Sequence, residues 1–86
     1  MAENKIVLTV KSTSGAFTDD FNINNKAQRV FDEALRRFRL VQGAGASYVL
    51  VREQGRSQLA LGEKIEDLGL VNGEVLILQA SQAQDG

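Results

Sequence analysis

The stretch "KIEDLGLVNGEVLILQ", from Lys64 to Gln79, decides the fold of this chain. Its first half places Ile65, Leu68 and Leu70 too irregularly for a strand, which favours a single helical turn that closes one end of a core. The pair "NG" follows and is typical of a turn. "EVLILQ" then has the apolar and β-branched residues of a buried strand. We therefore expect a short helical turn, a tight turn and a final strand.

The beginning of the chain predicts a hairpin. Residues 5–11, "KIVLTVK", place Ile6, Leu8 and Val10 on one side of an extended chain, which is the pattern of a strand with one face on a core. "STSGA" supplies turn residues. "FTDDFNI" then indicates a second strand, irregular or bulged, that ends near Asn24.

One long helix is predicted over residues 26–39. Six apolar residues repeat there at helical spacing: Ala27, Val30, Phe31, Ala34, Leu35 and Phe38. Asn25 is a good N-cap, and Gln28, three residues later, resembles the second member of a capping box. The glycines of "QGAGAS" end the helix.

Two further strands, "YVLVRE" and "QLAL", follow on either side of the turn "QGRS". One helix lying across a mixed sheet of four or five strands is the economical way to bury one helical stripe and one sheet face. The first and last strands should be central and parallel, because both carry unbroken apolar sequence. The predicted fold class is α+β.

This order of elements is that of the β-grasp, and the residues before the last strand resemble the ubiquitin-like family. In that family an apolar, a polar, an aspartate, a large apolar, a small or polar and another apolar residue stand in this order. The matching residues are Ile65, Glu66, Asp67, Leu68, Gly69 and Leu70. The resemblance covers about residues 5–79 and is greatest to the divergent ubiquitin-like modifiers of bacteria. It implies a β-grasp domain over 1–79 and a flexible C-terminal tail over 80–86.

The composition argues against several classes of function. The chain has 86 residues, enough for one small domain, and its apolar runs are far shorter than the roughly 20 residues of a membrane helix. It has no cysteine and no histidine, so thiolate nucleophiles, sulfur-based zinc sites and histidine bases are missing. A net charge of −1 argues against a nucleic-acid partner. The N-terminus does not resemble a signal peptide. We expect a cytoplasmic protein that is no enzyme, with no cofactor and no metal.

The tail "ASQAQDG" raises the question of a reactive terminus. The resemblance implies that the carboxylate of Gly86 is adenylated by an activating enzyme, passed to a conjugating enzyme and joined to an amine of a target protein, with a processing or deconjugating protease in the same system. Gly86 has no Cβ and fits a narrow channel, and seven extended residues span roughly 25 Å. Asp85 departs from the double glycine that is usual in the family, so a diverged cognate activating enzyme is expected. A tail without function stays an alternative at this stage.

Strand alternation also predicts a partner-binding patch. If Val49 and Val51, and likewise Val75 and Ile77, point into the core, their neighbours point outward. The predicted patch consists of Val7, Tyr48, Leu50, Leu76 and Leu78. Contiguous exposed apolar residues mark partner sites, and the resemblance implies that this sheet face is the main docking surface. The alternative is a shifted register, or a longer loop that covers these residues.

Two other classes of function stay open beside the covalent modifier. One is a noncovalent interaction module that uses the same sheet face. The other is a sulfur carrier whose terminal carboxylate becomes a thiocarboxylate, although such carriers also end in two glycines. The helix arginines and the acidic pairs are more simply solvated, turn or cap residues than sites for nucleic acid or metal.

Overall fold

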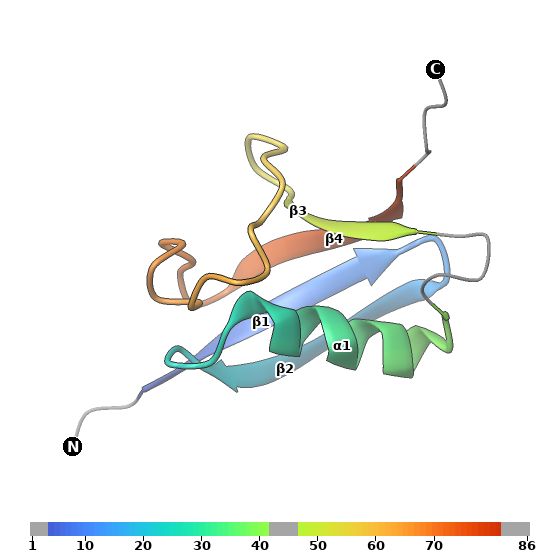
Figure 1. Ribbon diagram of the computed structural model, residues 1–86. Helices are drawn as coiled ribbons and strands as arrows, with labels where there is room; N and C mark the ends of the chain where they lie inside the picture. Colours follow the sequence, from blue (N-terminus) through green and yellow to red (C-terminus); the bar gives the residue numbers. More distant parts are fainter. Residues whose placement is uncertain (1–3, 42–46, 82–86) are drawn as a thin grey trace.

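The computed structural model describes residues 4–41 and 47–81. In this part of the chain, four strands and one helix follow one another as β1 (Lys5–Ser12), β2 (Gly15–Asn22), α1 (Ala27–Phe38), β3 (Tyr48–Arg52) and β4 (Glu74–Ala80). The strands form one sheet in the order β2-β1-β4-β3, and α1 lies across one of its faces (Figure 1). The predicted α+β class and helix-on-sheet architecture are thereby confirmed.

The first and last strands are central and parallel, as the sequence predicts. β1 pairs with β4 in parallel from Leu8↔Glu74 to Lys11↔Ile77, while β2 and β3 pair antiparallel at the two edges. The β1–β2 register is continuous from Lys5↔Asn22 to Ser12↔Gly15, so the expected bulge is absent from this hairpin. The predicted "QLAL" strand is reduced to a single bridge between Gln58 and Val51.

The helix begins without the predicted capping box. Its N-cap is Lys26, which makes no side-chain capping bond, and the Gln28 side chain instead donates to Asp32 at 2.8 Å. The first helical N–H groups are satisfied by a distant loop: Ala27 donates to the carbonyl of Glu63 and Gln28 to that of Leu61. Main-chain carbonyls thus satisfy the donors that a side chain was expected to cap.

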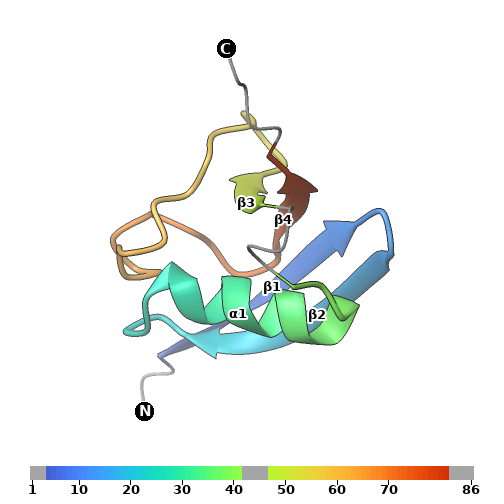
Figure 2. The same cartoon turned by 45° about the vertical axis from the view of Figure 1, so that its right-hand side comes forward.

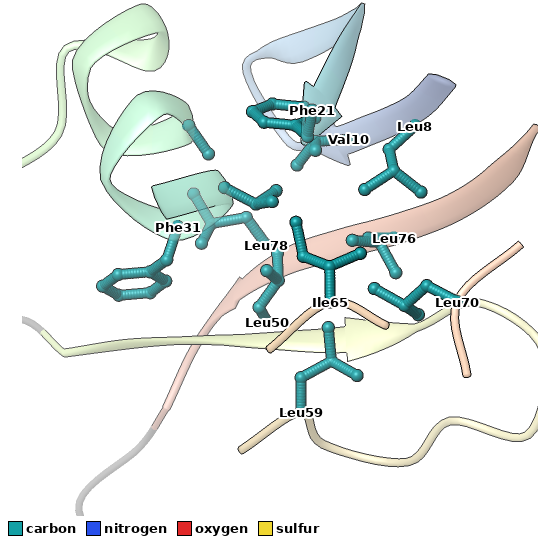
Figure 3. Close-up of a cluster of buried hydrophobic side chains, with 12 residues drawn as sticks. Leu8, Val10, Phe21, Phe31, Leu50, Leu59, Ile65, Leu70, Leu76 and Leu78 are labelled. Carbon is teal, nitrogen blue, oxygen red and sulfur yellow. The ribbon is translucent and has the colours of Figure 1, made fainter. Parts of the chain in front are cut away.

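The core lies between α1 and the sheet. It consists of Leu8, Val10, Phe21, Val30, Phe31, Ala34, Leu50, Leu59, Ile65, Leu70, Leu76 and Leu78. Figure 3 shows side chains from the strands, the helix and the connection after β3 pointing toward one another. Apolar burial of this kind is the main favourable term in folding.

Residues 64–70 close one end of this core, as predicted, but not as a helix. Ile65 is fully buried and Leu70 is 7% exposed. The main chain forms consecutive turns, with Asp67 and Leu68 both donating to the carbonyl of Lys64. The expected short helical turn is therefore not confirmed. Seen from the side in Figure 2, this connection passes over the first turn of α1.

Candidate functional site

The face of the sheet opposite α1, called the outer face here, carries apolar side chains that the helix does not cover. Leu8, Leu76 and Leu50 belong to the core, so the residues that alternate with them in β1, β4 and β3 point to the other side. The larger apolar members of the outer face are Val7, Val49, Val51, Val75 and Ile77. Val7 is 39% exposed, whereas Val51 is only 4% exposed.

Polar groups border this apolar strip. The hydroxyl groups of Thr9 and Thr18 lie 2.8 Å apart across β1 and β2. Lys11 is 3.1 Å from Glu53, and both side chains are about half exposed. An apolar centre with a polar, charged rim is the anatomy of a protein-binding surface.

The predicted patch is wrong for four of its five members. Leu50, Leu76 and Leu78 are 1%, 0% and 3% exposed and belong to the core, and Tyr48 packs against the same core. Only Val7 lies on the outer face as expected. The sequence analysis assigned Val49, Val75 and Ile77 to the core, and the structure places them outside.

The reason is a shift of one residue in the alternation of β3 and β4. Both faces of these strands carry apolar residues, so the pattern does not say which face is buried, and a shift of one residue exchanges them. The parallel register settles it, because Leu76 is opposite Val10 of β1 and so shares its buried face. The larger leucines fill the core, while β-branched residues line the outer face.

The C-terminal end of β3 carries a half-buried ion pair that the sequence analysis missed. Arg52 was expected to face outward, but its guanidinium makes two bonds to Glu74, of 2.6 and 2.9 Å. Arg52 also donates to the carbonyl of Leu68 at 3.2 Å, and Glu74 accepts the N–H of Val71 at 3.0 Å. The pair therefore ties β3 and β4 to the loop before β4. Nothing in the spacing of two residues 22 positions apart signals this contact.

A second ionic cluster lies on the helix. Hydrogen bonds from Arg36 and Arg37 lower the pKa of the Glu33 carboxyl to about 2. Arg37 also bonds Asp19 of β2 at 2.6 Å, and its guanidinium lies 4.6 Å from the centre of the Phe17 ring. Arg37 thereby links the helix to the edge strand, so these charged side chains stabilise the fold.

The described ranges 4–41 and 47–81 offer little that could form a metal site or a membrane span. No group of three or more histidine, cysteine, aspartate or glutamate side chains in them could hold a metal ion. Among the same residues, no helix is long and apolar enough to span a bilayer. A hollow of about 560 Å³ does lie beside the last pair of the β1–β4 ladder, lined by Lys11, Leu40, Tyr48 and Ile77 among others.

The end of β4 leads toward the predicted conjugation residues. β4 continues to Ala80, paired with Tyr48, and the N–H of Ser81 donates to the carbonyl of Ser47 at 2.8 Å. The ladder thus extends one residue beyond the expected boundary at 79. Asp85 and Gly86 lie outside the described residues.

Comparison with solved structures identifies the fold. A de novo design based on ubiquitin has a TM-score of 0.75 at 15% identity, with 99% of each chain covered. The ubiquitin of Caldiarchaeum subterraneum has a TM-score of 0.73 at 13% identity, covering 94% of this chain and 99% of that one. A structure described as molecular mimicry of SUMO that promotes DNA repair gives 0.74 at 10% identity, with 91% and 94% covered.

These likenesses confirm the ubiquitin-like β-grasp fold that the sequence predicts. No protein-family model matches the chain, and neither does any curated protein. The likeness to bacterial modifiers in particular stays a prediction, since the identities of 10–15% speak for the fold alone.

Proposed function

We propose that this chain is a ubiquitin-like protein modifier, attached to target proteins through the carboxylate of Gly86. A cognate activating enzyme adenylates that carboxylate, a conjugating enzyme transfers it, and the product is an amide with a target lysine. A deconjugating protease would reverse the step. The chain itself has no catalytic role in this scheme, and it acts in the cytoplasm.

The ubiquitin-like fold is the observation that carries this proposal. Its last strand is central in the sheet, and it leads to the segment that ends at Gly86. Glycine suits an acyl donor, because its carbonyl is unhindered and the residue passes through a narrow channel. Asp85 adds a charge and a Cβ next to that carbonyl, so the proposal requires an activating enzyme whose channel accepts an acidic side chain.

The test uses the full chain with adenosine triphosphate and a candidate activating enzyme. Intact mass spectrometry would detect a Gly86 acyl-adenylate, a thioester on the enzyme or an amide with a target lysine. Deletion of Gly86 should abolish all three products, while Asp85→Gly should slow a cognate enzyme adapted to the acidic residue. A product that persists without Gly86 would contradict the proposal.

The second candidate is a noncovalent interaction module, and the outer face is the observation that favours it. Val7, 39% exposed, is the one large apolar residue of that face in the described strands that counts as exposed. Val7→Asp places a charge in the apolar strip, and Val7→Thr is the matched control because it keeps the shape of valine. Docking and tail chemistry are separate if Val7→Asp removes binding of the activating enzyme while Val7→Thr and the deletion of Gly86 both leave that binding intact. Binding that persists with no carboxylate chemistry would favour the module.

The proposal also implies that the purified chain is inert by itself. Hydrolysis of peptides, esters or nucleotides by the chain alone, lost on substitution of one of its own residues, would refute both candidates.

A further inference from the structure

The turn before β4 contains a chemically labile pair of residues. Asn72 and Gly73 form the only Asn-Gly sequence in the chain. Gly73 has a φ of 87°, a left-handed conformation that favours glycine, and both residues are exposed. Neither burial nor a bulky following side chain therefore keeps the main-chain nitrogen of Gly73 away from the side chain of Asn72.

An asparagine followed by glycine can lose its amide group. The main-chain nitrogen of Gly73 gives up its proton and attacks the Cγ carbon of Asn72, ammonia leaves, and a five-membered succinimide forms. Water then opens either carbonyl of the ring, which yields aspartate or isoaspartate. Glycine permits the attack because no Cβ obstructs the approach of the nitrogen.

Both reacting groups are held by one residue of β1. The N–H of Gly73 donates to the carbonyl of Val7 at 2.7 Å, and the side-chain oxygen of Asn72 accepts the N–H of Val7 at 2.7 Å. The first bond retains the proton that the attack must remove. The second bond fixes the orientation of the amide that the nitrogen must reach.

We propose that Asn72 is a deamidation site gated by the pairing of β1 with β4. While Val7 holds both groups, the reaction is suppressed. When the first residues of this ladder open, the nitrogen and the amide are released together and the succinimide can form. Local opening of this kind occurs in native proteins without global unfolding.

The two products differ in what they do to the sheet. Aspartate keeps a side-chain oxygen that can accept the Val7 N–H, and it adds a negative charge near Glu74. Isoaspartate moves the main chain through the former side chain and lengthens it by one methylene. The Gly73 N–H then no longer matches the Val7 carbonyl, at the point where the Leu8↔Glu74 register begins.

The experiment incubates the purified full chain in mildly alkaline buffer, natively and in denaturing urea. Cleavage after glutamate releases residues 67–74, and the mass of this peptide reports deamidation at Asn72 alone. Native deamidation should be slower by about tenfold or more, because two hydrogen bonds must open first. Asn72→Gln is the control in both conditions, because its longer side chain would have to close a six-membered ring, which forms far more slowly.

Two comparisons keep the inference testable. Leu76→Ala weakens β4 from the core side and should speed native deamidation, whereas Ile77→Ala, its neighbour on the outer face, should have a smaller effect. The isoaspartate fraction should unfold at a lower urea concentration than unmodified chain. Equal native and denatured rates would overturn the gate, and a faster native rate would show that the Val7 N–H activates the amide instead of restraining it.

Discussion

Replacing Leu76 or Ile77 by alanine tests which face of β4 is buried in solution. The two substitutions remove the same number of carbon atoms from adjacent residues of one central strand. Leu76 is 0% exposed, whereas Ile77 lies on the outer face and is half-buried. The pair therefore separates the effect of burial from the effect of side-chain size.

The structure predicts unequal costs. Leu76→Ala should reduce the free energy of unfolding by about 3 kcal/mol, within the range of about 2–5 for buried leucines, because it removes core contacts and leaves a cavity. Ile77→Ala should cost about 1 kcal/mol, since only part of its surface is buried. A chain of this length is expected to have a total stability of about 4–13 kcal/mol.

Urea unfolding followed by far-ultraviolet circular dichroism measures both costs, and it suits a chain without tryptophan. With a slope of about 1 kcal/mol per molar urea, the midpoint should fall by about 3 M for Leu76→Ala and about 1 M for Ile77→Ala. Equal slopes in the two variants would show that both unfold from the same compact state. If Ile77→Ala costs as much as Leu76→Ala or more, the leucine-inward register is wrong.

Three further outcomes are expected. Stability should fall as the pH drops from about 5 toward 2, because the folded pKa of Glu33, about 2, lies below its unfolded value. Glu33→Gln should reduce this loss of stability by about 1 kcal/mol in acid titrations, and an unchanged loss would contradict the ion cluster. Glu74→Gln should cost about 2 kcal/mol in urea unfolding, because Arg52 loses its charged partner while half-buried; Glu66→Gln, at an exposed position, is the control. Arg39→Gly should stabilise by about 0.5–1 kcal/mol, because Arg39 has a left-handed φ of 58° at the helix C-cap; a lower melting temperature would refute this.

Much of the fold could be predicted because its signals are local. The period-two pattern of residues 5–11 and the helical spacing from Ala27 to Phe38 each fix one element and its buried side. In β1 the buried set is clear, since Lys5, Thr9 and Lys11 mark the opposite face as polar. Where one face of an element is polar, alternation alone gives the orientation.

The errors arise where the deciding contact is distant in sequence. β3 and β4 are apolar on both faces, so only pairing with β1 determines which face meets the helix. The same holds at the start of α1, where carbonyls of Leu61 and Glu63 replace the expected Asn25 cap. Tertiary contacts override local propensity in both places, and no pattern within either segment could have shown it.

The correction of the register changes where function should be sought on this chain. If the leucines of β3 and β4 pointed outward, every substitution in the predicted docking patch would leave the core intact. Because they point inward, Leu50→Ala or Leu76→Ala would weaken partner binding merely by unfolding the domain. The outer face offers substitutions without that confusion, and Val7 is the best of them because its side chain is partly exposed while its main chain holds Asn72 and Gly73. A side-chain change at Val7 leaves those main-chain bonds in place. Loss of enzyme binding by Val7→Asp at unchanged stability would therefore report on docking alone.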